Sequence, residues 1–248
     1  MNLLILMAGP SDRFREAGFA FPKNLIELEG QPLIQHVIEN LRTLRRGGDG
    51  RAILALRRDE NLRHHTDMVA RLLAPDALVC EVGEKIAGAA CSALLAISHI
   101  DNDQPLVIAN GDQIICADLA AAIAAFTERE LDGGIVVFDD VHPRWSFVRT
   151  DENGLVVEAA EKRPISRLAT AGFYYFARGR DFVRAAKRMI LKDASVDGLF
   201  YVCPAYNELL LENARIGIHL IPRNAYFSLA TPQGVQAYTE FLKAHPAP

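Results

Sequence analysis

Short apolar runs alternate with longer helical patterns through the first 140 residues, and this alternation limits the fold more than any other feature. Each run is rich in Ile, Val and Leu and has the length of a buried strand. Such alternation is typical of a mainly parallel sheet with helices on both faces. The predicted strands cover residues 3–7, 52–56, 78–81, 105–109 and 134–138, and the predicted helices cover residues 31–44, 61–73, 89–97 and 118–130.

The pattern changes after about residue 140. Residues 145–149 and 156–161 flank the segment "TDENG", in which Asn153-Gly154 is a strong signal for a hairpin turn. A further apolar run, 171–176, precedes a helical pattern at 181–191. Because no Ser- or Gly-rich linker separates the two parts, we expect residues 1–248 to form a single α/β domain in which the second part extends the same sheet.

Composition and charge exclude several classes of protein. Of the 248 residues, 50% are hydrophobic and 23% are charged, which is ordinary for a folded globular chain. The formal net charge of −4 offers no general attraction for nucleic acid or an anionic membrane, so any anion site must be local. The first apolar run lacks the length and flanks of a signal peptide or membrane span, so we expect a cytoplasmic protein. The four cysteines show no C-x-x-C pair, which favours reduced, packed thiols over zinc or disulfides.

The segment "AGPSDRFREAGFAFPK", residues 8–23, follows the first predicted strand. Phosphate binds well at such a turn, because backbone N–H groups of small residues can face its oxygens. The small residues here are Ala8, Gly9 and Ser11, Arg13 adds a planar fork of donors, and Lys23 adds a mobile charge after a proline. The alternative is an ordinary strand-to-helix loop with solvated charges, and this segment alone favours neither.

A second candidate lies in "PLVIANGDQII", where an apolar strand runs directly into Asn110-Gly111-Asp112. A carboxylate at the end of a strand can hold Mg²⁺ among phosphate oxygens, because this hard cation prefers oxygen ligands. Gly111 would let a substrate approach the backbone closely. The alternative is an ordinary turn, since Gly-Asp is common in loops.

Two further segments carry weaker signals. Glu161-Lys162 ends a predicted strand, where the cation could meet a second anionic substrate and the carboxylate could accept hydrogen bonds from hydroxyl groups. A surface ion pair is the commoner explanation for an isolated Glu-Lys. Gly88 and Ala89 open a predicted helix and leave room for a flat group against the backbone, although close helix packing explains them as well.

In this order the segments resemble the sugar-phosphate nucleotidyltransferase family, over nearly the whole chain from Leu3 to Pro232. The family signature has the form Gly-x-Gly-x-Arg, a variable spacer, then Pro-Lys. This chain keeps Gly9, Arg13 and the Pro-Lys pair ending at Lys23, but it has Ser11 at the second glycine. The resemblance implies a Rossmann-like, three-layer α/β sandwich of the glycosyltransferase-A type with a mixed, mostly parallel sheet.

The resemblance also implies a role for each candidate residue. It divides the domain into a nucleotide-binding half, 1–140, and an acceptor-binding half, 141–248. Arg13, Lys23 and Asp112 would act in catalysis, with Asp112 as the magnesium ligand and Lys23 near the phosphate under attack. Glu161 would contact a sugar hydroxyl, Lys162 the acceptor phosphate, and Gly172, in "TAGFYYF", would lie beside the sugar. The nucleotide contacts would be Ala8, Gly9, Ser11, Arg13, Lys23, Gly88, Ala89, Asn110 and Gly111.

The implied partners are a nucleoside triphosphate and a sugar phosphate, with Mg²⁺ as cofactor; assembly into a homo-oligomer is left open. An oxygen of the sugar phosphate would attack the α-phosphorus in line and pyrophosphate would leave. Because two polyanions must meet, the protein would mainly position them and neutralise charge. No general base is needed, since the attacking oxygen is already charged at neutral pH.

Two alternatives remain at this point, and a third is disfavoured. The acceptor could be a non-sugar phosphate, which would make the chain a cytidylyltransferase of another kind, or the chain could be a non-catalytic nucleotide-binding relative. A glycosyltransferase would carry Asp-x-Asp after a strand, whereas Asp101-Asn102-Asp103 precedes one.

Family members with a two-carboxylate metal site often have an Asp where this chain has Ser228, so we expect Asp112 to be the sole carboxylate on the metal.

Overall fold

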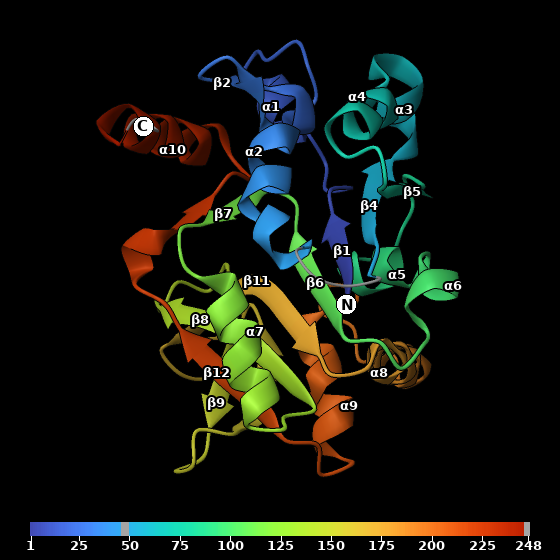
Figure 1. The fold of residues 1–248 in the computed structure, drawn as a ribbon, viewed down its shortest axis with the longest axis vertical. Coiled ribbons are helices and arrows are strands. Elements are labelled where there is room, and N and C mark those ends of the chain that lie inside the picture. The colour runs from blue at the N-terminus through green and yellow to red at the C-terminus, as the bar shows by residue number, and fades with distance from the viewer. Residues whose placement is uncertain (46–49, 246–248) are drawn as a thin grey trace.

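A nine-stranded sheet forms the centre of the computed structural model, which describes residues 1–45 and 50–245 (Figure 1). Its main strand order is β10-β9-β11-β6-β1-β4-β5, and β8 pairs with both β11 and β12. Every strand of this sheet except β10 and β11 runs in the same direction, so the expected mixed, mostly parallel sheet is confirmed. The strands are β1 (Asn2–Leu6), β4 (Ala52–Arg57), β5 (Leu78–Val82), β6 (Leu106–Asn110), β8 (Gly133–Asp139), β9 (Ser146–Thr150), β10 (Val156–Glu161), β11 (Leu168–Phe176) and β12 (Ile216–Leu220).

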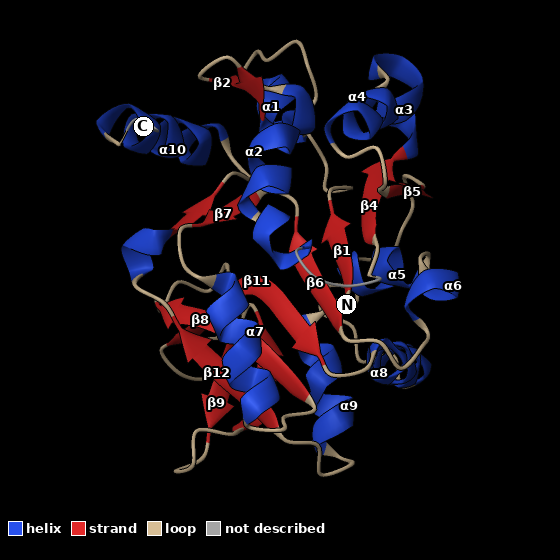
Figure 2. Cartoon of the chain, viewed as in Figure 1, coloured by secondary structure: helices blue, strands red, loops and turns tan. Residues whose placement is uncertain are grey.

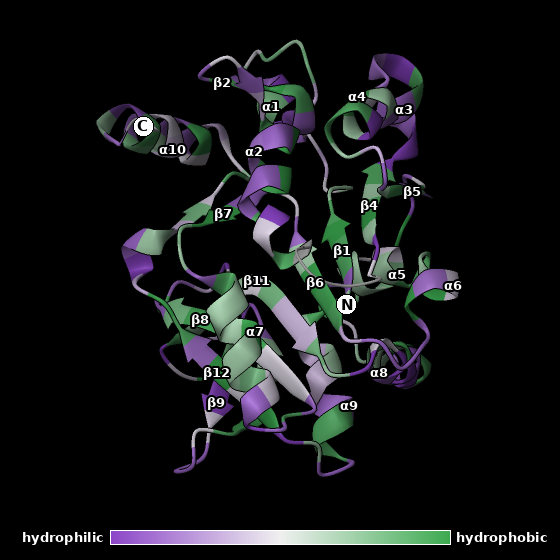
Figure 3. Ribbon diagram, in the orientation of Figure 1, coloured by the Kyte–Doolittle hydropathy of each residue, from purple (hydrophilic) through white to green (hydrophobic). Residues whose placement is uncertain are grey.

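Helices cover both faces of the sheet and give it three layers (Figure 2). Neighbouring side chains of β1 point to opposite faces, so Leu3 and Ile5 join one hydrophobic cluster and Leu4 joins the other. Figure 3 shows the hydrophobic colour along β1, β4 and β6, as expected for strands buried on both sides. The first cluster includes residues of α2 (Leu33–Asn40), α4 (Thr66–Leu73), α7 (Leu119–Glu128) and α10 (Pro232–Ala244), and the second includes residues of α5 (Ala89–Leu94), α6 (Ile97–Ile100), α8 (Gly179–Leu191) and α9 (Tyr206–Leu210).

Several predicted helices are shorter or divided in the structure. The predicted helix 61–73 is two helices, α3 (Arg58–His64) and α4, because His65 between them has a left-handed φ of 52°. The predicted helix 31–44 begins later, since residues 31 and 32 form the short strand β3 (Gln31–Pro32) against β2 (Glu27–Leu28). The predicted helix 89–97 is likewise interrupted between α5 and α6.

The part of the chain after residue 140 extends the same sheet. β11 pairs with β6 and therefore joins the later strands to the first parallel group. β9 and β10 form the expected antiparallel hairpin, with Gly154 in its turn at a φ of 72°. None of the described helices is long and apolar enough to cross a membrane.

A small second sheet brings the C-terminal segment to the end of β6. In it β7 (Gln113–Ile115) pairs with β13 (Tyr226–Ser228), and Ser228 lies opposite Gln113. The backbone N–H of Leu229 donates to the carbonyl oxygen of Asp112 at 2.7 Å. Residues more than a hundred positions apart therefore meet where the first-half strands end.

Candidate functional site

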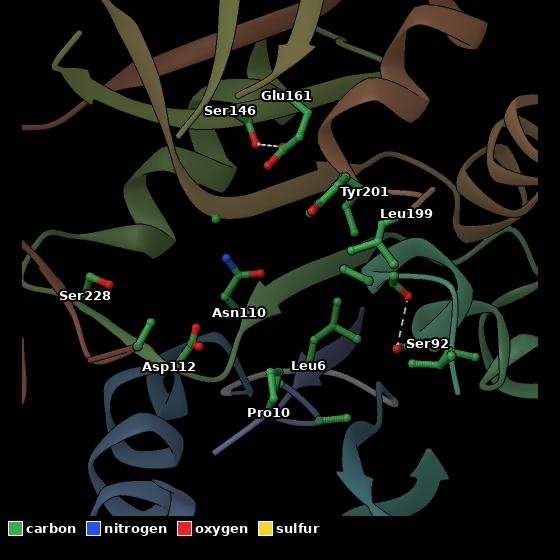
Figure 4. A pocket seen from close by; sticks show the side chains of 18 of the residues that line it. Leu6, Pro10, Ser92, Asn110, Asp112, Ser146, Glu161, Leu199, Tyr201 and Ser228 are labelled. Atoms are coloured by element: carbon green, nitrogen blue, oxygen red, sulfur yellow. Dashed lines mark hydrogen bonds between the residues drawn. The ribbon is translucent and has the colours of Figure 1, made fainter. Parts of the chain in front are cut away.

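A cavity of about 800 Å³ opens at the carboxyl ends of β1, β4, β5 and β6 (Figure 4). We call it the main cavity. Figure 4 shows Asn110 and Asp112 on one side of it and Ser146 and Glu161 across from them. Ligands of open α/β sheets bind outside these strand ends. The lining is formed by Leu6, Ala8, Gly9, Pro10, Asp12, Arg57, Glu84, Lys85, Ile86, Gly88, Ala89, Ser92, Asn110, Asp112, Arg144, Trp145, Ser146, Glu161, Thr170, Gly172, Tyr174, Leu199, Tyr201, Val202, Tyr226, Ser228 and Ala230.

Lys23 does not extend into solvent as a mobile charge; it is buried beneath the loop that follows β1. Its side chain is 4% exposed, and Nζ donates to Asp112 Oδ2 at 2.7 Å. A Cβ at Gly9 would lie 3.0 Å from this Nζ, so the bare glycine leaves room for the ammonium group. The ion pair thus joins the residue-23 segment to the end of β6, and only Asp112, at 27% exposure, reaches the main cavity.

Ser11 does not line the main cavity, which differs from the expectation of a nucleotide contact. Its side chain is buried: Oγ donates to Glu60 Oε1 at 2.7 Å and accepts from the backbone N–H of Lys23 at 3.0 Å. Its φ of −101° lies in the range open to all residues, so this position does not require glycine. Burial raises the pKa of Glu60, against the lowering effect of the Ser11 hydrogen bond. The serine therefore ties the loop to α3 and to Lys23.

Gly111 is also absent from the lining described for the main cavity. Its N–H donates to the carbonyl oxygen of Leu6 at 2.8 Å, and an added Cβ would lie 2.3 Å from Cγ of Met7. The glycine therefore allows β6 to continue close against β1, and packing alone accounts for it. Asn110 and Asp112 on either side of it do line the main cavity.

Gly88 and Ala89 line the main cavity, and Gly88 is also required by packing. It has a φ of 100°, and a Cβ there would lie 2.4 Å from the carbonyl oxygen of Phe200. Phe200 is hydrogen-bonded on both sides, to Ala87 O and from Ala90 N, each at 2.9 Å. The close-packing explanation for Gly88 therefore holds, and the contact with a nucleotide base stays a prediction.

Glu161 and Gly172 lie on the opposite wall of the main cavity. Ser146 Oγ donates to Glu161 Oε2, while burial raises the pKa of the Glu161 carboxyl group. Gly172 has a φ of 60°, and a Cβ there would lie 2.2 Å from Nδ2 of Asn110. Its carbonyl oxygen accepts from Gln113 Nε2 at 3.0 Å. Gly172 is therefore the point where β11 fits against the end of β6.

Arg13 and Lys162 line an adjoining cavity of about 970 Å³ instead of the main one. Arg13 projects from α1 (Asp12–Glu16). Lys162 has a left-handed φ of 53°; its Nζ donates to Asp197 at 3.1 Å and lies 5.2 Å from the centre of the Tyr201 ring. Tyr201 and Asp197 together raise the pKa of Lys162.

Several lining residues were not singled out from the sequence. Arg57 is the last residue of β4 and Lys85 lies in the segment just after β5, so the rule that ligands bind at strand ends could have found them. Trp145, Tyr201 and Tyr226 come from distant loops and strands, and no local pattern identifies them.

Among the groups that line the main cavity, the Asp112 carboxylate and the nearby Ser228 hydroxyl group suit a hard cation. The part of the chain that the structure describes holds no group of three or more His, Cys, Asp or Glu placed to bind a metal. Asp112 has Oδ2 on Lys23, and among the described residues no hydrogen bond reaches its Oδ1. Ser228 lies near Asp112 through the pairing of β13 with β7. This donor set fits a Mg²⁺ ion that keeps most of its ligands from waters and substrate phosphates.

Residues 2–200 match the model of a known family, described as nucleotidyl transferase. The chain belongs to the nucleotidyl transferase family. The match covers the loop after β1, the end of β6 and the β9–β10 hairpin, which all contribute to the main cavity. The comparisons confirm the predicted family and reaction class, that of a sugar-phosphate nucleotidyltransferase.

Individual relatives within the family differ in what their names say they act on. A UTP–glucose-1-phosphate uridylyltransferase of Haloferax volcanii is 28% identical over 181 residues, covering 71% of this chain and 72% of that protein. The bifunctional protein GlmU of Burkholderia orbicola is 30% identical over 171 residues, covering 67% of this chain and 34% of GlmU. This chain therefore matches only about a third of the length of GlmU.

Solved structures agree with the family. A nucleoside-diphosphate-sugar pyrophosphorylase from Vibrio cholerae RC9 superposes with a TM-score of 0.81 at 25% identity, covering 97% of this chain and 99% of the other. A UDP-glucose pyrophosphorylase from Acinetobacter baumanii superposes with a TM-score of 0.73 at 15% identity, covering 99% and 94% of the two chains. The second likeness, at this identity, shows the fold alone.

Replacing Gly172 with alanine should damage the site more than the same change at Gly154. Both glycines have a positive φ, so each substitution should lower the free energy of unfolding by about 1–2 kcal/mol through backbone strain. Only at Gly172 would the new Cβ also meet Asn110 and Gln113, which should add about 1–3 kcal/mol of overpacking. Urea unfolding of both variants measures the difference. Equal losses of stability would show that β11 yields at Gly172 without displacing the end of β6.

Proposed function

We propose that the main cavity binds a nucleoside triphosphate together with a sugar phosphate and transfers the nucleotidyl group to the sugar phosphate, releasing pyrophosphate. The observation that carries this proposal is the single cavity shared by the loop after β1, the end of β6 and the Glu161–Gly172 wall. Two substrates that must react in line need such a common space, with their reacting atoms held together. The family membership supports the reaction class.

The nucleotide would occupy the side formed by the first-half strands. The backbone of Ala8 and Gly9 would face its phosphates, and the segment at Gly88 and Ala89 would lie against its base. Lys23 would act from beneath the loop, since its ammonium group is fixed near Gly9 by Asp112. A buried, oriented charge is more effective than a solvated one because little solvent screens it.

The acceptor would occupy the opposite wall. Glu161, held by Ser146, would accept hydrogen bonds from a sugar hydroxyl, and Gly172, which lines the same wall, would lie beside the sugar. Lys162 would reach the acceptor phosphate from the adjoining cavity, and Arg13 would neutralise charge from the same side. The attacking phosphate oxygen is already ionised, so these residues need only orient it and offset repulsion.

Asp112 is the residue that would hold Mg²⁺. The ion would supply charge neutralisation between the phosphate oxygens during transfer. Asp112 has a carboxylate oxygen available for this, whereas Ser228 offers only a hydroxyl group. A single protein carboxylate implies that the metal binds chiefly together with the nucleotide.

A direct assay tests the proposed function. We expect pyrophosphate release when the protein, Mg²⁺ and a nucleoside triphosphate are combined with a sugar 1-phosphate, tested as a matrix of five nucleotides against a panel of sugar phosphates and one non-sugar phosphate alcohol. Release only with the non-sugar acceptor would favour a cytidylyltransferase of another kind. Nucleotide binding without release in any combination would favour a non-catalytic relative.

A matched pair of variants tests the proposed role of Lys162 in the same assay. Lys162→Ala should raise KM for the sugar phosphate at least about tenfold, equal to about 1.4 kcal/mol, and change KM for the nucleotide much less. Lys187→Ala removes an exposed lysine of α8 that lines neither cavity and should change neither constant. Equal effects of Lys162→Ala on both constants would remove the acceptor role.

Metal binding can be tested without turnover. Calorimetric titration of Mg²⁺ should show weak binding to the free protein and much tighter binding once a nucleoside triphosphate is present. Asp112→Asn should weaken the nucleotide-dependent binding, and Ser228→Asp should strengthen binding to the free protein by adding a carboxylate beside the first. Tight binding without nucleotide that persists in Asp112→Asn would contradict this assignment.

A further inference from the structure

The cavity lined by Arg13 and Lys162 continues from the main cavity and is unusually basic. The two cavities share Arg144, Trp145, Tyr226, Ser228 and Ala230, so they adjoin at these residues. We call the second one the basic cavity. Its volume of about 970 Å³ is larger than a single phosphate requires.

Every charged residue that lines the basic cavity is basic. Arg13, Arg144, Lys162 and Arg223 contribute to the wall together with His245, and within the described residues no Asp or Glu lines it. The main cavity, by contrast, mixes Asp12, Glu84, Asp112 and Glu161 with its cations. Because the chain as a whole carries a formal charge of −4, this concentration of cations is local and marks a place for anions.

Arg144 lines both cavities, and its guanidinium group is not paired with a carboxylate of the described residues. Its guanidinium carbon lies 4.2 Å from the centre of the Trp145 ring, and no carboxylate of the described residues forms an ion pair with it. Trp145 is itself held, because its indole N–H donates to Asp140 Oδ2 at 3.0 Å. Stacking on a fixed ring orients the guanidinium and leaves its donors available.

Arg223 is oriented by the same aromatic cluster. Its guanidinium carbon lies 4.8 Å from the centre of the Phe138 ring, and Phe138 packs against both Trp145 and Tyr226. Arg223 Nε donates to Asp140 Oδ2 at 3.2 Å and Nη1 donates to the carbonyl oxygen of Tyr226 at 3.2 Å, so among the described residues only Nη2 has no hydrogen-bond partner. Two guanidinium groups are therefore held in place on one set of rings at the side of the basic cavity.

The origin of the cations along the chain indicates which substrate they serve. Arg144, Lys162, Arg223 and His245 all come from the part after residue 140, which forms the proposed acceptor wall, and only Arg13 comes from the loop after β1. Lys162 alone is enough to bind the acceptor phosphate. The two stacked arginines exceed that need, and planar guanidinium groups suit a carboxylate or a phosphate equally well.

We propose, building on the proposed function, that the natural acceptor carries a second acidic group besides its transferable phosphate, and that Arg144 and Arg223 hold this group in the basic cavity. The second group is a carboxylate or a further phosphate. A neutral sugar phosphate would leave Arg144 without an anionic partner and Arg223 with Asp140 alone, whereas an acidic acceptor gives each arginine a further acceptor for its N–H groups.

Matched acceptors test this proposal in the pyrophosphate-release assay. Glucuronic acid 1-phosphate and glucose 1-phosphate differ in the sugar only by a carboxylate, and 3-phosphoglycerate presents a phosphate and a carboxylate without a sugar. We expect kcat/KM to be at least tenfold higher for an acidic acceptor than for glucose 1-phosphate. A higher kcat/KM for glucuronic acid 1-phosphate than for 3-phosphoglycerate would identify the natural acceptor as a sugar acid. The reverse order would identify it as a non-sugar acid.

Variants separate the arginines from general charge effects. Arg144→Ala and Arg223→Ala should each reduce the preference for the acidic acceptor at least fivefold, by raising its KM more than that of glucose 1-phosphate. Arg215→Ala removes an exposed arginine that lines neither cavity and should leave the preference unchanged.

The outcomes distinguish this proposal from the one on which it rests. Equal use of acidic and neutral acceptors would overturn the second acidic group while leaving the proposed function intact. An effect of Arg144→Ala mainly on KM for the nucleotide would assign the basic cavity to the triphosphate and also overturn it. If pyrophosphate is released with none of the acceptors, the proposed function fails. Calorimetric titration of the same acceptors then tests the second acidic group separately. Weaker binding of both acidic acceptors than of glucose 1-phosphate would overturn the proposal.

Discussion

The ion pair between Lys23 and Asp112 is the contact on which the arrangement of the site depends. It joins the loop after β1 to the end of β6 at 2.7 Å, with the lysine almost fully buried. Removing one partner of a buried pair leaves an uncompensated charge, which typically destabilises a protein by about 3–5 kcal/mol. The loop, the strand end and the β7–β13 sheet attached through Leu229 therefore hold one another in position.

Two serines near this pair stand where the resemblance leads us to expect other residues. Ser11 stands where the signature has its second glycine, yet its side chain binds Glu60 and the backbone of Lys23 below the loop. The hydrogen bonds add a tie between three segments where the signature's glycine, having no side chain, could make none. Ser228 stands where relatives with a two-carboxylate metal site often have an aspartate, and this leaves Asp112 shared between Lys23 and the proposed Mg²⁺. Ser11 thus supports the position of Lys23, and Ser228 leaves Asp112 as the carboxylate that would hold the metal.

The sequence predicts the parallel strands well because their signal is local. Runs such as 3–7 and 52–56 are buried on both faces, and they match β1 and β4 within one residue. Helix lengths are less predictable, since the break at His65 follows from a left-handed backbone that the residue type does not demand. The sequence points to Asp112 because it follows β6, at the carboxyl ends of the parallel strands. Glu161 also lines the main cavity, although it ends β10, which runs in the opposite direction.

The burial of individual side chains and the contacts between distant segments could not be predicted from the sequence. It shows that Lys23 is charged but not that Asp112, 89 positions away, holds it beneath the loop. The aromatic cluster that orients Arg144 and Arg223 joins three separate segments, and none of its rings has a local pattern that reveals the others. Gly111 shows the same limit, since a glycine beside a candidate ligand residue proved to pack against β1.

A double-mutant cycle on Lys23 and Asp112 tests the central claim most directly. Lys23→Ala, Asp112→Ala and the double variant would be compared with the parent chain for the free energy of unfolding and for kcat/KM in pyrophosphate release. The account predicts strong coupling, with the double variant losing less than the sum of the single losses by about 1–3 kcal/mol in both measurements. Additive losses within about 0.5 kcal/mol would show that the two residues act independently, and would contradict the account.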